Sequence, residues 1–306
     1  MKFLSIILAS LIFTIPSYAQ SNLISLKTEY SSEGDAFIYS NSQAAVNYTV
    51  KINFKILLGY TSNVSNPYIT TVSVGRNQIT KLIRDKNASA PISQYGYTYY
   101  AGVAFRKPPV SYIHYVLPIT PGKTTKVTRV ESISDLLGQK SENQFYAQGF
   151  TYNLGDTICA TRAGNVYNIN DQLKQGEGRD TIFTDSRNKI HIQHKDGTLG
   201  FYSILSPIEN LVQNGDFVIP GQPIAIFNKS ANKYTMLFSV YYLDEEKIRA
   251  DVPKDVYNAL PISYYLNENA LSTKLVENQK YDSKLAPVII SEELNKREKK
   301  KYGFLN

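Results

Sequence analysis

Four stretches in the second half of the chain read GDTICATRAGNV (155–166), IHIQHKDGTLGFYSIL (190–205), LVQNGDFVIPGQPIA (211–225) and YTMLFSV (234–240). Apolar residues alternate with other residues in each stretch, and turn signals such as Asp196-Gly197 and Asn214-Gly215-Asp216 separate the runs. Alternation with a period of two is typical of a strand with one face on a core, and glycine permits the backbone conformations of tight turns. The pattern predicts an antiparallel β domain whose apolar side chains share one face.

The residues before this region show a similar pattern. From Asn22 to Thr128, short alternating runs are separated by turn-forming residues, and the run from Val46 to Phe54 alternates most plainly. We expect strands over residues 45–58, 68–74, 95–105 and 111–118. Together they predict a β-sandwich of immunoglobulin-like size.

The composition also favours strands. The chain contains 24 tyrosines and 13 phenylalanines among its 306 residues, and long helical patterns are few. The predicted fold class is therefore all-β, with an N-terminal β-sandwich over 20–125, an antiparallel β domain over 126–285 and a basic, partly helical tail over 286–306. Short helices are expected near 133–137, within 245–258 and over 291–301.

The N-terminal residues indicate export. Met1-Lys2, an apolar run from Phe3 to Pro16 and the small-x-small site Ser17-Tyr18-Ala19 are typical of a secretory signal peptide. We expect a periplasmic or otherwise exported protein that begins at Gln20 and has no integral membrane segment after cleavage.

The formal net charge of +7 is partly local, because the tail carries Lys296, Arg297, Lys299, Lys300 and Lys301. Export makes nucleic acid an unsuitable partner for this charge, so none is expected. A charge run of this kind is usually a solvated, frayed helix end, and contact with anionic envelope polymers is the alternative.

The order and spacing of the four stretches resemble the LytM or lysostaphin-type zinc metalloendopeptidases, which cut peptide cross-links in peptidoglycan. The resemblance extends outward over Val110 to Tyr281, through YVLP (115–118) with PGK (121–123) on one side and LPISY (260–264) on the other. It implies the duplicated hybrid motif fold of that family for the second domain.

The same resemblance implies where a zinc site would lie. Family members hold zinc with a His and an Asp from an early loop and the second His of a His-x-His strand, and two further His residues assist catalysis. The corresponding positions here are Gly149 for the Asp, Thr235 and Leu237 for the His-x-His strand, and Ile204 for the His of a Tyr-x-His-Leu motif. Because a catalytic zinc needs about three protein ligands and an open position, these residues imply a degenerate member with no metal, no cofactor and no catalytic residue.

Other chemistry has little support in the sequence. His191 and His194 are the only close histidine pair, and residues three apart in a strand point to opposite faces, so one metal ion could not easily bind both. The single cysteine, Cys159, lies in an apolar strand and is interpreted as a small hydrophobe. Ser203 is not part of the Gly-x-Ser-x-Gly motif of serine hydrolases.

We therefore expect a pseudoenzyme of the cell envelope that binds or regulates peptidoglycan or an envelope protein. Two alternatives stay open: an active zinc peptidoglycan endopeptidase with displaced ligands, and a structural subunit of an outer-membrane or secretion complex. Tyr95, Tyr97 and Tyr99 would share one strand face, and with Tyr100 and Tyr241-Tyr242 they are interpreted either as cross-strand packing or as flat rings for a sugar or protein partner.

Overall fold

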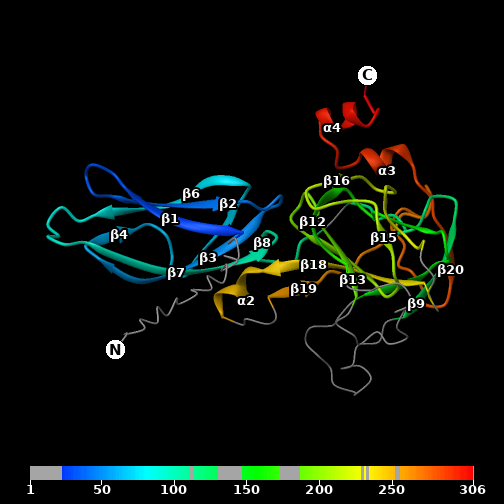
Figure 1. Cartoon of the computed structure of the whole chain (residues 1–306), viewed down its shortest axis with the longest axis horizontal. Helices are drawn as coiled ribbons and strands as arrows, with labels where there is room; N and C mark the ends of the chain where they lie inside the picture. The colour runs from blue at the N-terminus through cyan, green and yellow to red at the C-terminus, as the bar shows by residue number, and fades with distance from the viewer. Residues whose placement is uncertain are drawn as a thin grey trace, which may run out of the picture.

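The structure is a computed structural model that describes residues 23–110, 113–129, 147–171, 187–228, 231, 234–251 and 256–305. Its strands form two bodies that lie side by side along the long axis (Figure 1). Antiparallel sheets make up both bodies, and the described helices are short, so the predicted all-β fold class is confirmed.

The first body is a sandwich of two sheets, with strand orders β1-β2-β6-β4 and β5-β3-β7. Side chains at alternate positions of β3, such as Val50, Ile52 and Phe54, pack against the facing sheet and form its core. The strands are β1 (Ile24–Tyr30), β2 (Ala36–Ser42), β3 (Tyr48–Leu58), β4 (Tyr60–Ser62), β5 (Tyr68–Val72), β6 (Gly75–Arg84) and β7 (Ile92–Ala101).

The second body is built on a ten-stranded sheet whose main path is β16-β12-β13-β14-β18-β10-β9-β20, with β19 and β8 also paired to β18. A smaller sheet, β11-β17-β15, packs against it. The strands are β8 (Ala104–Phe105), β9 (Thr124–Arg129), β10 (Gln148–Thr151), β11 (Thr157–Cys159), β12 (Gly164–Asn170), β13 (Asn188–Gln193), β14 (Leu199–Ile204), β15 (Glu209–Asn210), β16 (Phe217–Val218), β17 (Pro223–Ile226), β18 (Thr235–Asp244), β19 (Tyr257–Ala259) and β20 (Lys280–Asp282).

One face of the large sheet carries the core of the second body. Ile190, Tyr202 and Phe238 lie in one row across β13, β14 and β18, and they pack with Ile158 and Ile224 of the smaller sheet. We call this the core face and the opposite side of the same sheet the outer face. The predicted Asp196-Gly197 hairpin joins β13 to β14, where the Gly197 N–H donates to the His194 carbonyl at 2.9 Å.

The change from the first core to the second falls between β7 and β8, earlier than the predicted boundary at residue 125. Strand β8 pairs in parallel with the end of β18, and Tyr115, Leu117 and Ile119 pack in the core of the second body. Residues 113–118 form no strand; only an isolated bridge joins Tyr115 to Tyr264. This segment is apolar because it packs against the second core, not because it belongs to a sandwich strand.

Hydrogen bonds join the two bodies. The Gln193 side chain accepts from the Asn47 N–H and donates to the Asn47 carbonyl, both at 2.9 Å. The buried ammonium of Lys51 donates to the Ile248 carbonyl at 2.8 Å and pairs with Asp251. These contacts fix the end of the outer face that lies nearest the first body.

The three helices that the described residues contain are α2 (Glu245–Arg249), α3 (Pro287–Ser291) and α4 (Lys296–Lys301). Helix α2 covers the start of the helix expected within 245–258. Helix α4 covers the second half of the helix expected over 291–301, whereas α3 ends where that helix was expected to begin. The helix expected near 133–137 lies outside the described residues, as does the proposed signal peptide. None of the described helices is long and apolar enough to cross a membrane.

The C-terminal segment docks on the second body through a buried arginine. The guanidinium of Arg162 makes two hydrogen bonds to Glu293, at 2.8 and 2.6 Å, and one to Asp196 at 2.9 Å. Burial alone would lower the pKa of Arg162, but Tyr115, Glu293 and Asp196 outweigh it and raise the pKa, so the group stays charged. The charged pair therefore holds the chain between α3 and α4 against the sheet (Figure 1).

Candidate functional site

The positions expected to correspond to a zinc site lie mainly on the outer face of the large sheet. Strand pairing places Thr128, Gly149, Leu237 and Ser203 in one row across β9, β10, β18 and β14. Thr235 lies on the same face, one pair further along β18. Three of the four expected positions are therefore neighbours.

Packing closes this row. A Cβ atom on Gly149 would lie 2.1 Å from the Thr128 Oγ1 and 3.1 Å from the Thr128 carbonyl oxygen, so any side chain at residue 149 would force Thr128 to shift. The Leu237 side chain is 3% exposed. A metal ligand at residue 149 would have to displace its neighbour, and the isobutyl group of Leu237 offers no electron pair to a metal.

Ile204 lies away from the other three positions. It pairs with Met236 and packs in the core of the second body, on the core face. Its neighbour Ser203 is the residue of the 202–205 motif that stands beside Leu237 on the outer face. The alternation of β14 predicts that Ile204 lies on the core face, because residues two apart in a strand share a face and both Tyr202 and Ile204 are apolar.

Beside the closed row, an aromatic strip crosses four strands of the outer face. His191 stacks on Phe201 with ring centroids 4.1 Å apart and an interplanar angle of 16°. Phe201 contacts Tyr241 at 5.0 Å, and Tyr167 contacts His191 at 5.7 Å. All four residues are half-buried. The sequence pattern indicated Tyr241 as a candidate binding residue but not Phe201 or Tyr167. The proximity of these two depends on the register of β12, β13 and β14.

The electrostatics of the strip favour uncharged rings. Burial, with help from Lys189, lowers the pKa of His191 to about 4, and burial raises the pKa of Tyr241. The Nδ1 atom of His191 lies 3.2 Å from the Asn168 Nδ2, which suits a neutral imidazole that accepts a hydrogen bond. At neutral pH the strip therefore presents neutral aromatic surface.

His194 is separate from this strip. Its imidazole is buried on the core side, where it contacts Tyr115 edge-on and its Nδ1 donates to the Ala163 carbonyl at 2.8 Å. Burial, with the nearby Arg162, lowers the pKa of His194 to about 3. The strand geometry thus places His191 and His194 on opposite faces.

Other candidate groups are placed in packing roles. Cys159 is fully buried, and burial raises its pKa to about 11, so the thiol stays protonated and is a weak nucleophile at neutral pH. Tyr95 and Tyr97 pack on the core of the first body and donate or share hydrogen bonds with Thr28 and Ile24. Within the ranges that the structure describes, no three His, Cys, Asp or Glu side chains are grouped to hold a metal ion.

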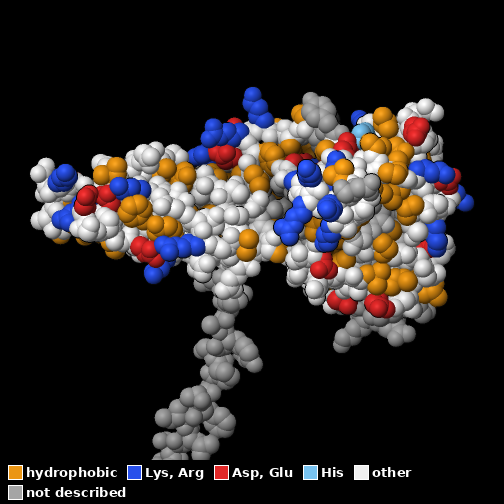
Figure 2. Space-filling view, turned by 90° about the horizontal axis from the view of Figure 1, so that it is seen from above, with side chains coloured by type: hydrophobic (Ala, Val, Ile, Leu, Met, Phe, Trp, Pro, Cys, Tyr) orange, Lys and Arg blue, Asp and Glu red, His pale blue; other side chains and the backbone are white. Residues whose placement is uncertain are grey.

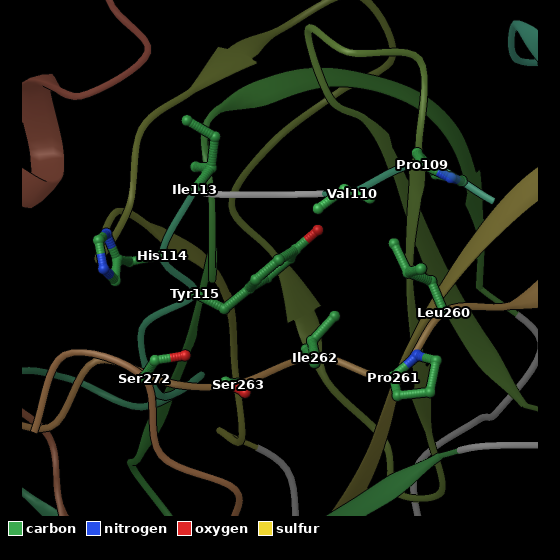
Figure 3. Close-up of a pocket in the computed structure, with 10 residues that line it drawn as sticks. All are labelled: Pro109, Val110, Ile113, His114, Tyr115, Leu260, Pro261, Ile262, Ser263 and Ser272. Atoms are coloured by element: carbon green, nitrogen blue, oxygen red, sulfur yellow. The ribbon is translucent and has the colours of Figure 1, made fainter.

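A cavity of about 490 Å³ lies between the chain that links the bodies and the segment after β19 (Figure 3). The ring of Tyr115 forms its floor, and Val110, Leu260 and Pro261 stand around it. His114 points away from the Leu260 side and is held by Glu292, with Nδ1 3.1 Å from both carboxylate oxygens. Apart from His114, the described lining offers apolar surface and hydroxyl groups.

No protein-family model matches the sequence, and no match was found among curated proteins. Among solved structures, the chain is similar to Helicobacter pylori Csd3 from an orthorhombic crystal, at 13% sequence identity and a TM-score of 0.30. The alignment covers 91% of this chain and 82% of that one. A likeness at this level says nothing about function.

Proposed function

We propose that this protein is a non-catalytic, LytM-like protein of the cell envelope that binds peptidoglycan, or regulates an envelope partner, without cutting it. The observation that carries the proposal is the closed row of Gly149, Leu237 and Ser203 on the outer face. At the expected ligand positions, Gly149 has only a hydrogen atom as its side chain and Leu237 has an isobutyl group, and neither can bind a metal. Thr128 fills the space beside Gly149.

A hydrolytic zinc site needs about three nitrogen, sulfur or oxygen ligands on rigid elements and a free position for water. Thr235, the remaining outer-face position, is almost fully buried and paired with Thr151. These neighbours supply packing where the resemblance would require ligands.

The aromatic strip gives the proposed binding surface. The stacked rings of His191 and Phe201, with Tyr241 beside them, form flat apolar faces with polar edges. Such rings gain contact area with little loss of conformational entropy, and they suit the faces of sugar rings. The net charge of +7 is complementary to the carboxylates of peptidoglycan.

Sedimentation with purified peptidoglycan tests this surface. The full chain is expected in the pellet, and Phe201→Ala and Tyr241→Ala are each expected to lower the pelleted fraction because they remove part of the strip. Tyr30→Ala is the matched control, since Tyr30 is 64% exposed in the first body. Equal pelleting of all variants would exclude the strip as the contact surface. If the full chain stays in the supernatant, peptidoglycan binding is excluded and only regulation of an envelope partner remains.

A further inference from the structure

A second concave site lies at the other end of the large sheet, between α4 and the edge strands β12 and β16. The cleft has a volume of about 440 Å³. Asn165 and Phe217 line it from the strands, Lys195 from the β13–β14 turn, and Arg297, Lys301 and Tyr302 from the C-terminal segment. Its volume is in the range of sites that hold a small organic ligand.

The cleft is preformed because α4 is fixed at several points. The buried Arg162–Glu293 pair anchors the chain just before the helix, and Lys195 donates to the Glu293 carbonyl at 3.0 Å. Asn295 and Glu298 form a capping box at the start of α4, with bonds of 2.9 and 2.7 Å. After the helix, the Tyr302 ring contacts Phe217 with centroids 6.3 Å apart. The expected frayed end is therefore an ordered wall.

The lining carries an excess of positive charge. Arg297 and Lys301 are four residues apart on α4 and so lie on the same side of the helix. Among the described residues neither of them pairs with a carboxylate, whereas Lys195 lies 3.6 Å from Glu298. Figure 2, which looks onto this end of the molecule, shows Lys and Arg side chains gathered there. A ligand carboxylate would find two cations that the fold leaves available.

The lining is also mixed in character. Glu298 faces the same cleft, 3.6 Å from Lys195, and its carboxylate suits a ligand that carries an amino group as well as carboxylates. Phe217 and Tyr302 add apolar wall for a hydrocarbon portion. A short acidic peptide combines these three features, because it carries carboxylates, a free amino group and hydrocarbon segments.

We propose that the cleft between α4 and the β12–β16 edge binds a short acidic peptide, with carboxylates on Arg297 and Lys301 and a free amine toward Glu298. This site is distinct from the outer face, and it does not depend on the function proposed for that face. The basic tail is then a recognition element and not a solvated end.

Calorimetric titration of the full chain with the tripeptide Gly-Glu-Glu tests the proposal. Binding is expected at low ionic strength and is expected to weaken as salt rises. The double variant Arg297→Gln/Lys301→Gln is expected to weaken binding at least about tenfold, because it removes both carboxylate partners. The matched control is Lys296→Gln/Lys300→Gln, which removes the same charge from the same helix at positions outside the cleft.

Selective loss of binding in the first variant supports the proposal. Equal loss in both variants would overturn it, because binding would then follow net charge alone. Absence of binding at millimolar tripeptide would overturn it as well. Inorganic phosphate serves as the competing probe, and tighter binding of phosphate than of Gly-Glu-Glu would contradict the assignment to a peptide.

Discussion

At the scale of single residues, Gly149 and its neighbours decide what the outer face can do. The closest atom to a Cβ at residue 149 would be the Thr128 hydroxyl oxygen, at 2.1 Å. Real side chains do not tolerate this distance, so either the hydroxyl or the strand must move. The position expected for a metal-binding carboxylate is thus one where a side chain cannot be added unless Thr128 moves.

Gly149→Ala is expected to lower the free energy of unfolding by about 1–3 kcal/mol, the usual cost of overpacking. Adding Thr128→Ala is expected to restore part of the loss, because it removes the hydroxyl that the new methyl group meets. Gly96→Ala in β7 is the control, since its Cβ would meet only the end of Lys55 at 3.6 Å. Denaturant unfolding measures all of these; a Gly149→Ala variant as stable as the parent would contradict the described packing.

The half-buried His191 and the buried His194 predict a loss of stability in acid. Burial lowers the pKa of His191 from 6.5 to about 4 and that of His194 to about 3, so the unfolded chain binds protons that the folded chain does not. Stability from this source is present above about pH 6.5 and decreases as the pH falls toward 4.

His191→Phe, which keeps a ring on Phe201, is expected to reduce the slope of unfolding free energy against pH between pH 6.5 and 4. The measurement is urea unfolding at a series of pH values in both proteins. Unchanged slopes would show that His191 does not remain neutral in the folded state.

At the scale of elements, a buried ion pair is a main contact between the C-terminal segment and the second body. The side chains of Arg162 and Glu293 are 1% and 7% exposed. Removing one member of a buried pair leaves the other charge without compensation, which costs about 3–5 kcal/mol. Docking of α3 and α4 should therefore be far more sensitive to Glu293 than to the adjacent Glu292.

Glu293→Ala is expected to speed hydrogen exchange in residues 287–301 while the ten-stranded sheet keeps its protection. Glu292→Ala, which removes the more exposed pair with His114, is the control and is expected to have a smaller effect. Comparable exchange in the two variants would show that the buried pair does not hold the segment.

Local sequence pattern predicted the elements well where the information is local. The alternation from Val46 to Phe54 gave β3, and Asp196-Gly197 gave the hairpin between β13 and β14. Residues 111–118 were predicted as a strand from their apolar pattern. The same pattern arises when an irregular segment packs its apolar side chains in a core, as Tyr115 and Leu117 do. The docking of Glu293 on Arg162 spans 131 residues and leaves no local pattern.

For the candidate site, the sequence predicted which residue types occupy the expected positions, but not how they are arranged. Gly149, Thr235 and Leu237 share the outer face, whereas Ile204 lies on the core face. The stacking of His191 on Phe201 requires the register of two strands, and the basic cleft requires the long-range docking of α4. Both are tertiary features that alternation and spacing do not encode.

At the scale of the whole molecule, the first body covers one end of the outer face of the second. Hydrogen bonds cross the junction at three places. Asn47 and Gln193 share two, and the buried Lys51 ammonium donates to the Ile248 carbonyl. The Tyr257 hydroxyl donates to the Ala101 carbonyl at 2.9 Å. The first body therefore contacts the second at the end of the outer face where Gln193 lies.

Gln193→Ala is expected to loosen the junction, because it removes two hydrogen bonds and leaves the Asn47 backbone groups without their partner. Small-angle scattering should then show a larger radius of gyration than in the parent protein. A matched change at the far side of the sheet, Gln213→Ala, serves as the control. An unchanged scattering curve for Gln193→Ala would show that the remaining junction contacts suffice.

The central proposal is that this protein binds peptidoglycan, or regulates an envelope partner, without cutting peptidoglycan. Chromatography of the soluble fragments released from purified peptidoglycan tests it most directly, with the full chain supplied with zinc and, separately, with a chelator. No release above the buffer control is predicted in either condition, because Gly149, Leu237 and Ile204 occupy the positions where the resemblance to zinc endopeptidases would require ligands and proton-transferring groups. Release of peptide fragments with zinc, abolished by the chelator, would contradict it and establish an active peptidase with displaced ligands.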